Sequence, residues 1–224
     1  MFERMQLLPL FQGLSFKELS EIVEWMKMDF YQFRSGDNLV NQGDKCSSIT
    51  FVISGVVCAE YMDAKGRFVL SETLASPFVL EPYNIYGMHQ SYTRTYWMKT
   101  DGGGLVIPKN VFNELLRRYQ IIRTNFMNTI CTRLQYHERE LSDLTMLNIR
   151  GKILKTIISV SCTSKGYKLL KIKMETLADI IGATRLNVSR ELNKMQQEQL
   201  INIRRGTIEI FKFEGLYPSL YNRM

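Results

Sequence analysis

Apolar positions recur at different spacings along the chain, and each spacing predicts a different kind of element. Residues 1–30 carry an apolar stripe at helical spacing, and Ser15 can cap the helix that ends near Met28. The stripe consists of Phe11, Leu14, Leu19, Ile22, Val23 and Met26. This pattern predicts a helical N-terminal segment.

The pattern changes over residues 31–108, where short apolar runs alternate with turn residues at intervals of about 8–12 residues, as in an all-β sandwich or barrel. The expected strands are Asp29–Phe33, Asn38–Val40, Ser48–Ser54, Val56–Met62, Arg67–Leu74, Tyr92–Thr100 and Leu105–Ile107. Glycines lie in the intervening segments, where the backbone must reverse. The Asp-Gly-Gly-Gly run at 101–104 is therefore expected to be a turn.

Helical spacing returns from Asn110 to about Leu141, a stretch of roughly 30 residues or about 45 Å of helix. A barrel of this size cannot cover an apolar stripe of that length, so part of the stripe needs another partner. The same helix of a second chain, packed as a two-fold pair, is the economical partner. The expected homodimer interface comprises Ile122, Phe126, Ile130, Leu134 and His137. The alternative is a helix that packs wholly on its own barrel.

Three further segments follow the long helix. Leu144–Val160 predicts another helix, and residues 162–170 (CTSKGYKLL) read as a polar loop. Residues 173–201 then predict two short helices joined by a tight turn, the helix-turn-helix arrangement. Gly182 lies where the turn needs a small residue or a positive φ, and Thr184 can cap the second helix.

The second helix of this pair has two unlike faces. Val188, Leu192 and Met195 recur at helical spacing and are expected to point into the domain. The opposite face carries Leu186, Ser189, Arg190, Asn193 and Gln197. A surface of small, polar and arginine side chains suits the major groove of DNA. The plainer interpretation is a helical hairpin with one solvated face.

Two features favour DNA over a solvated face. Residues 201–213 predict two strands around a turn at Arg205-Gly206, which would form a wing. Charge also segregates, because residues 145–224 hold 14 Lys and Arg against 6 Asp and Glu, whereas residues 1–144 hold 15 against 16. The excess positive charge therefore lies with the helix-turn-helix, as expected for a module that binds a polyanion.

Composition sets broad limits on the class of protein. A chain of 224 residues with 45% hydrophobic and 23% charged residues is typical of a soluble globular protein of one large or two modest domains. It has no apolar run of about 18 residues. The N-terminus carries Glu3 and Arg4 and lacks the apolar core of a signal peptide. We therefore expect a cytoplasmic protein that does not associate with membranes.

The sequence offers little support for metal or cofactor chemistry. The four cysteines are scattered: Cys46, Cys58, Cys131 and Cys162. Their spacing does not match a disulfide framework, a zinc site or an iron–sulfur cluster, so we expect small buried apolar residues. A haem ligand at His89 or His137 is the minor alternative. We expect neither a metal nor a cofactor.

Catalytic chemistry is equally poorly supported. Catalysis needs a nucleophile beside a base, paired carboxylates or a metal site, and none can be assembled from this sequence. The glycine run at 101–104 lacks the lysine and the strand–loop–helix setting of a phosphate loop. We therefore expect a protein that is not an enzyme.

The order of predicted elements resembles the Crp/Fnr family of bacterial transcription regulators over nearly the whole chain. Its strongest parts are residues 177–195 (LADIIGATRLNVSRELNKM) and 33–57 (FRSGDNLVNQGDKCSSITFVISGVV). The resemblance implies an α+β fold with an N-terminal cyclic-nucleotide-binding-type β jelly roll, a long dimerisation helix and a C-terminal winged helix-turn-helix. It divides the chain at 1–109, 110–144 and 145–224.

The resemblance also implies roles for residues of the second helix. Arg185, Ser189 and Arg190 match family positions that contact DNA, and Arg190 is the candidate for a bidentate contact to guanine, worth about 1–3 kcal/mol of discrimination. Many relatives have glutamate, which can accept from cytosine N4, where this chain has Leu186. Leucine can instead touch a thymine methyl, so a different half-site is expected.

The remaining residues of the expected DNA surface serve affinity and register. Contacts to the DNA phosphates position a protein on the duplex without reading its sequence. The candidates for phosphates are Thr184, Lys194, Arg204 and Arg205. Asn187 and Asn193 complete the expected DNA-binding set.

The effector region departs from the family pattern. Nucleotide-binding relatives carry Gly-Glu and, about ten residues on, Arg-Ser/Thr-Ala, which hold the ribose and the phosphate. Here Gly-Glu is absent, Arg94-Thr95 is the candidate remnant, and Tyr96 replaces the small residue. The region is rich in aromatic residues, namely Phe78, Tyr83, Tyr86, Tyr92, Tyr96 and Trp97.

This departure argues against cAMP and favours either a different effector or a filled cavity with none. The candidate effector-binding residues are Tyr92, Arg94, Thr95 and Trp97. Arg94 has an equally good interpretation as a surface residue of a strand.

Together these observations predict a homodimeric regulator that binds double-stranded DNA at a near-palindromic operator. An unidentified small-molecule effector, or none, would control it, and RNA polymerase is an expected partner. Two alternatives remain open. One is a cyclic-nucleotide-binding regulator with a cAMP-like ligand, and the other is a protein-binding module that does not bind DNA.

Overall fold

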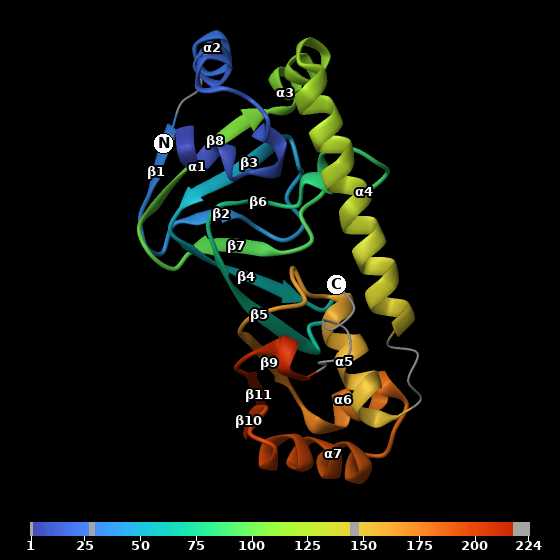
Figure 1. The fold of residues 1–224 in the computed structure, drawn as a ribbon. Helices are drawn as coiled ribbons and strands as arrows, with labels where there is room; N and C mark the ends of the chain where they lie inside the picture. The colour runs from blue at the N-terminus through green and yellow to red at the C-terminus, as the bar shows by residue number, and fades with distance from the viewer. Residues whose placement is uncertain (1, 27–29, 144–147, 217–224) are drawn as a thin grey trace. The chain divides into compact units, whose positions relative to one another are not determined.

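A computed structural model of the protein describes residues 2–26, 30–143 and 148–216 (Figure 1). The expected helix end near Met28 and the start of the expected helix at Leu144 lie outside the described residues. Among the helices of the described ranges, none combines the length and apolar character needed to cross a bilayer.

The chain divides into two compact units. Unit 1 comprises Met1–Cys58 and Leu74–Gln135, and unit 2 comprises Ala59–Thr73 and Tyr136–Met224. This division differs from the expected domain boundaries, because residues 59–73, assigned to the jelly roll by the sequence pattern, group with the C-terminal part of the chain.

Unit 1 begins with α1 (Phe2–Gln6), a 3-10 turn η1 (Pro9–Phe11) and α2 (Phe16–Met26). Ser15 starts α2 with a capping box, in which Ser15 N donates to Glu18 Oε2 at 2.8 Å and Glu18 N donates to Ser15 Oγ at 3.3 Å. The predicted cap at Ser15 is therefore confirmed.

Two groups of antiparallel strands form the sandwich of unit 1. The four-stranded sheet has the order β1 (Phe30–Phe33), β8 (Gly102–Pro108), β3 (Ser48–Ser54) and β6 (Phe78–Val79). The second group pairs β2 (Asn38–Val40) with β7 (Thr95–Met98). Both β2 and β3 begin and end where the sequence predicts, β7 is shorter than expected, and the sequence pattern missed the short β6.

The glycine run at 101–104 corrects one prediction. Gly102 to Gly104 do not form a turn but lie in β8, where all three pair with β1, and Gly103 and Gly104 also pair with β3. A Cβ atom on Gly104 would collide with the carbonyl oxygen of Phe51, and one on Gly102 would collide with that of Ser54. Glycine is therefore present here to let adjacent strands approach closely, rather than to reverse the chain.

The expected long helix is two helices, α3 (Lys109–Arg118) and α4 (Gln120–Asp143). Tyr119 leaves the helical region, with φ −114° and ψ 100°, and ends α3. The apolar spacing continues on both sides of this residue, so periodicity alone could not locate the break. The prediction of one continuous helix is therefore wrong.

Unit 2 packs three helices on an antiparallel sheet. The helices are α5 (Ile149–Ser159), α6 (Met174–Ile181) and α7 (Arg185–Gln197). The sheet has the order β10 (Ile201–Arg204), β11 (Thr207–Ile210), β9 (Lys168–Ile172) and β5 (Phe68–Ala75), with β4 (Val56–Met62) next to β5, and η3 (Phe213–Leu216) follows the sheet in sequence. The helix expected from Leu144 thus begins, within the described residues, at Ile149, where Asn148 Oδ1 accepts from Gly151 N at 2.7 Å.

Strand β5 completes the core of unit 2. It pairs with β9 from Phe68↔Ile172 to Glu72↔Lys168, and Phe68 and Leu70 are buried in the same apolar cluster as the three helices. The expected polar loop at 162–170 is therefore corrected, because its last residues begin β9.

A buried ion pair joins β5 to β9. The side chain of Lys168 is fully buried, and its Nζ donates to the Glu72 carboxylate and to Thr163 O at 2.6 Å. Glu72 also accepts from Cys162 N at 2.6 Å, so it holds the loop before β9 as well as the lysine. The Lys168 ammonium lies 5.1 Å from the centre of the Phe213 ring.

The cysteines follow the expectation only in part. Cys46 and Cys58 are buried, as the sequence predicts, whereas Cys162 is half-buried and Cys131 is exposed on α4. Burial raises the pKa of the Cys46 thiol. The prediction of four buried apolar residues is therefore wrong for Cys131, which lies on the outer side of its helix.

We predict that Lys168→Met lowers the free energy of unfolding of unit 2 by about 3–5 kcal/mol, because Glu72 would stay buried without its partner. Glu72→Gln combined with Lys168→Met should recover most of this loss, since neither charge remains. Urea unfolding followed by circular dichroism measures the loss, and hydrogen exchange of residues 168–172 locates it. Fluorescence of Trp25 and Trp97, both in unit 1, is the control. Unchanged exchange in β9 would contradict the role assigned to the pair.

Candidate DNA-binding surface and effector site

A tight turn fixes the angle between α6 and α7. Gly182 adopts the left-handed conformation at φ 63° and ends α6, as its position in the sequence predicts. Thr184 begins α7, with its Oγ1 accepting from Asn187 N at 3.3 Å. Both predictions for the turn are confirmed, so α6 and α7 have the local geometry of a helix-turn-helix.

The two faces of α7 are separated as the sequence predicts. Val188 and Leu192 are fully buried, and Met195 is 1% exposed, which anchors the helix to the core of unit 2. The outer surface carries Arg185, Leu186, Asn187, Arg190, Asn193, Lys194 and Gln197, all exposed, with Ser189 partly buried. Leu186 is 59% exposed, a large apolar side chain in a polar surface.

The two arginines of this surface differ in their partners. Arg185 Nε lies 3.2 Å from Glu175 Oε1 on α6, and both side chains are more than half exposed, so the pair is weak and solvent-screened. Within the described part of the chain, the Arg190 guanidinium has neither a hydrogen-bond nor an ion-pair partner. Arg190 is thus an exposed donor whose hydrogen-bonding groups are not used by the protein itself.

Arg150 on α5 holds the inner edge of α7, a contact that the sequence pattern did not reveal. Its Nε donates to Glu191 Oε1 at 2.6 Å, and its two terminal nitrogens donate to Glu198 at 2.9 and 3.0 Å. The same guanidinium lowers the pKa of Glu198, while its hydrogen bonds to Glu198 and Glu191 raise the pKa of Arg150. A fork of this kind fixes orientation as well as charge. Arg150 is therefore a positioning residue for α7.

The wing forms where it is predicted. Strands β10 and β11 pair from Ile201↔Ile210 to Arg204↔Thr207, and the connecting turn is Arg205-Gly206 with Gly206 at φ 73°. The strands end at Ile210, three residues earlier than the expected segment.

Arg204 and Arg205 are exposed at the tip of the wing. Arg204 lies 3.9 Å from Glu209, which also accepts from Tyr167 OH at 3.0 Å. Partial burial and this hydrogen bond raise the pKa of Tyr167. The structure thus gathers both wing arginines at one end of β10 and β11.

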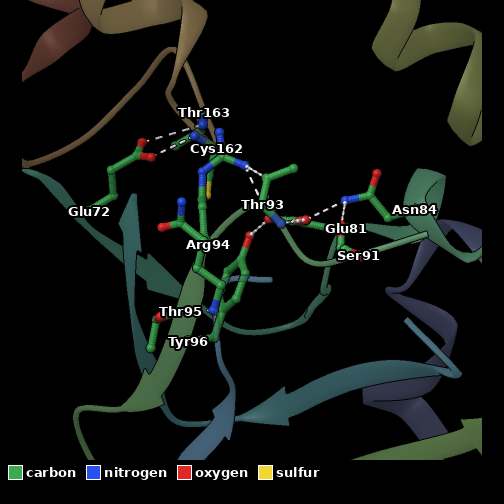
Figure 2. Close-up of polar contacts among 11 residues, drawn as sticks. Glu72, Glu81, Asn84, Ser91, Thr93, Arg94, Thr95, Tyr96, Cys162 and Thr163 are labelled. Carbon is green, nitrogen blue, oxygen red and sulfur yellow. Dashed lines mark hydrogen bonds and ion pairs between the residues drawn. The ribbon is translucent and has the colours of Figure 1, made fainter. Parts of the chain in front are cut away.

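The region predicted to bind an effector contains a buried cluster around Glu81. Figure 2 shows Asn84, Thr93, Arg94 and Tyr96 converging on the Glu81 carboxylate. Thr93 N and Thr93 Oγ1 each donate at 2.7 Å, Tyr96 OH at 3.1 Å and Arg94 Nη1 at 3.2 Å, and Asn84 Nδ2 donates as well. Glu81 and Arg94 are both buried, at 3% and 6% exposure. Arg94 is therefore an interior residue, and its interpretation as a surface strand residue is wrong.

Of the predicted effector residues, only Arg94 belongs to this cluster. Tyr92 OH donates to Ser48 O at 3.2 Å, and Thr95 Oγ1 accepts from Gln42 N at 3.0 Å. Trp97 is half-buried on β7. Sequence reasoning missed Glu81 because it searched for Gly-Glu, whereas Leu80 precedes the glutamate here. A glutamate thirteen residues before the single arginine of this region was the available signal.

The predicted dimer residues fall into two groups. Ile122 is fully buried in unit 1, and Phe126 packs edge-on against Phe112 with ring centres 5.2 Å apart. Ile122 therefore offers no surface to a second chain, which corrects that part of the predicted interface. Ile130 is half-buried and Leu134 is 58% exposed, while the side chain of His137 lies outside the described residues.

Among the residues that the structure describes, no three His, Cys, Asp or Glu side chains gather as ligands for a metal ion. His89 is exposed.

Two family models match this chain, and their positions agree with the two sites. The cyclic nucleotide-binding domain matches residues 31–119, which include the Glu81 cluster. The Crp-like helix-turn-helix domain matches residues 151–218, which include α6, α7 and the wing.

Similar proteins include two cAMP-activated global transcriptional regulators. CRP of Salmonella typhimurium is 20% identical over 198 residues, which are 84% of this chain and 93% of CRP. Vfr of Pseudomonas aeruginosa is 22% identical over 188 residues, which are 80% of this chain and 88% of Vfr.

Similar solved structures support the same fold. The catabolite activator protein of Thermus thermophilus superimposes with a TM-score of 0.50 at 18% identity, covering 96% of this chain and all of that one. A regulator of the Crp/Fnr family from Eubacterium rectale gives a TM-score of 0.54 at 19% identity, covering 94% of this chain and 98% of that one. At these identities the likeness shows the fold. With both domain models matched in this order, the chain belongs to the Crp/Fnr family of bacterial transcription regulators.

Proposed function

We propose that this regulator binds a near-palindromic DNA operator as a homodimer and reads its sequence with α7. The observation that carries the proposal is the outer face of α7, where Arg190 is exposed and unpaired while the opposite face is fully buried. A helix held by its apolar face in this way presents its polar face in a fixed orientation. The excess positive charge of residues 145–224 supplies the long-range attraction to DNA.

Residues of this surface take different parts in the proposal. Arg190 donates two hydrogen bonds to a guanine in the major groove, Arg185 and Ser189 contact neighbouring bases, and Leu186 touches a thymine methyl. The remaining members of the surface, which are Thr184, Asn187, Asn193, Lys194, Arg204 and Arg205, bind phosphates or base edges nearby. The weak Arg185–Glu175 pair can exchange for DNA at little loss, because both side chains are already solvated.

The homodimer in this proposal forms through the outer side of α4. Met127 and Leu134 are 59% and 58% exposed, and with Ile130 they follow the three- and four-residue spacing of a coiled-coil seam. A two-fold pair would present two copies of α7 to successive major grooves, about 34 Å apart. In this arrangement the regulator acts in the cytoplasm and contacts RNA polymerase.

Binding to duplex DNA at rising salt tests the proposal directly. The logarithm of the affinity should fall linearly with the logarithm of salt, with a slope of about −0.9 per phosphate contact. Arg190→Ala should weaken binding to a site obtained by in vitro selection by about 1–3 kcal/mol and leave the weaker salt-sensitive binding to unrelated DNA. Lys155→Ala, an exposed cation on α5, is the matched control. Salt-independent binding, or unchanged selectivity of Arg190→Ala, would overturn the assignment.

Leu186→Glu should change the selected half-site at one position. A carboxylate accepts from cytosine N4 but gains nothing from a thymine methyl, so an A·T preference should become a G·C preference. In vitro selection with both proteins measures the change, after normalising for the lower overall affinity that the added negative charge causes. Leu186→Ala is the control, expected to lose the preference without acquiring a new one. Recovery of one and the same site with all three proteins would contradict the contact.

Leu134→Glu should convert the dimer to a monomer, because it places a charge in the proposed apolar seam. Light scattering coupled to size-exclusion chromatography gives the mass of each species. Phe211→Glu is a control, since Phe211 is similarly exposed but lies outside α4. A Leu134→Glu protein that keeps the mass of the wild-type dimer would place the interface elsewhere.

A further inference from the structure

We propose that Glu81 is a built-in counter-ion for Arg94, occupying the place where the phosphate of a cyclic nucleotide would pair with this arginine. The jelly roll of this regulator would then close without an anionic effector. The inference concerns the regulation of the proposed DNA-binding function, and it rests on that function only for the measurement of DNA affinity.

The first argument is the supply of buried positive charge. Recognition of a nucleotide phosphate in a domain interior relies on charge-assisted hydrogen bonds, most effectively from arginine. Among the residues of the matched domain at 31–119, all of which the structure describes, Arg94 is the only Lys or Arg that is buried. Its Nη1 lies 3.2 Å from Glu81 Oε1, so an acid of the protein already neutralises this cation.

The second argument is how firmly the acid is held. Besides Arg94, the Glu81 carboxylate accepts from Thr93 N, Thr93 Oγ1, Tyr96 OH and Asn84 Nδ2. Together these donors fix the position and orientation of the carboxylate against the arginine. An incoming phosphate would have to displace it or place a second buried anion beside it on one guanidinium, and both alternatives are unfavourable.

The third argument is the backbone at Glu81. It lies at φ 31° and ψ 58°, in the left-handed region that disfavours residues with a Cβ atom. A non-glycine residue keeps such a conformation when surrounding contacts determine it. Here five hydrogen bonds to the carboxylate, four from side chains and one from Thr93 N, are contacts of this kind. The chain therefore enters η2 (Pro82–Ile85) in a conformation that places the acid against Arg94.

The fourth argument is space. A cavity of about 10 Å³ borders this segment, lined by Val79 and Pro82 together with apolar residues of η1, β3 and α4. Such a volume is about that of one probe sphere, whereas sites for small molecules usually measure about 300–1,000 Å³. The cavity beside Val79 and Pro82 is therefore too small for a ribose and a base.

The wild-type protein gives the first test. Isothermal titration with cAMP and with cGMP, each raised to about 1 mM, should show no binding, because a dissociation constant below this range would be detected. The affinity for a selected DNA site should also be unchanged by either nucleotide. Binding of either nucleotide, with or without a change in DNA affinity, would overturn the inference.

The second test removes the built-in anion. Glu81→Gln keeps the shape of the side chain but leaves the Arg94 guanidinium buried without a counter-charge, so the melting temperature should fall. Added inorganic phosphate should raise the melting temperature of Glu81→Gln by several degrees more than that of wild type, because an anion bound only to the folded state stabilises it. An equal response of both proteins would overturn the inference.

The double variant Glu81→Gln with Arg94→Met is the matched control. It lacks both charges, so its melting temperature should respond to phosphate only as wild type does, through general salt effects. If it responds as strongly as Glu81→Gln alone, the anion binds elsewhere and the inference fails. Should Glu81→Gln not fold in any buffer, the nucleotide titrations of wild type decide alone.

The outcomes separate this inference from the proposed function. If the protein binds neither DNA nor nucleotides, the proposed function is refuted and the inference about Glu81 still holds. If the protein binds DNA and cAMP tightens that binding, the proposed function holds and the inference about Glu81 is refuted.

Discussion

A buried cation must be matched by an acid, and this constraint organises both units of the chain. Lys168 and Arg94 have each lost nearly all contact with solvent, which in a protein interior costs several kcal/mol per ion before any pairing. Glu72 neutralises the lysine and Glu81 neutralises the arginine. Because each acid also accepts hydrogen bonds from neighbouring residues, it fixes the surrounding chain as well as the charge. In unit 2 the ion pair joins β5 to β9. In unit 1 it forms the centre of the buried polar cluster around Glu81.

The pairing of Glu72 with Lys168 gives β5 a role in the DNA-binding unit. Phe68 and Leu70 on this strand share an apolar cluster with Val188 and Leu192 of α7. The presentation of the outer face of α7 therefore depends on a segment that lies about a hundred residues earlier in the chain. The winged helix-turn-helix of this protein is completed by a strand from the middle of the sequence, and residues 145–224 alone lack part of its core.

Local signals in the sequence were sufficient to predict the helix-turn-helix, because its determinants lie within a few residues of one another. Gly182, Thr184 and the spacing of Val188 and Leu192 each act within one or two helical turns. Long-range determinants were not accessible in this way. Lys168 looks like a loop residue until its acid, 96 residues away in sequence, is known. Likewise the glycines of β8 resemble a turn until the strands that approach them are placed. The interior position of Arg94 depends on Glu81, and neither residue reveals the other by periodicity.

The charge of α7 illustrates how position matters more than composition. The helix carries Arg185, Arg190 and Lys194, but Glu191 lies within it and Glu198 directly follows it, and two free carboxylates would oppose the approach of a phosphate backbone. Arg150 binds both acids from α5, so their charge is compensated on the inner edge of the helix. The arginines of the outer face are left either free or in a weak, solvated pair. Net charge alone would describe the segment from Arg185 to Glu198 as only weakly basic, with three bases against two acids. The separation of its acids from its bases gives one face a positive potential that suits a polyanion.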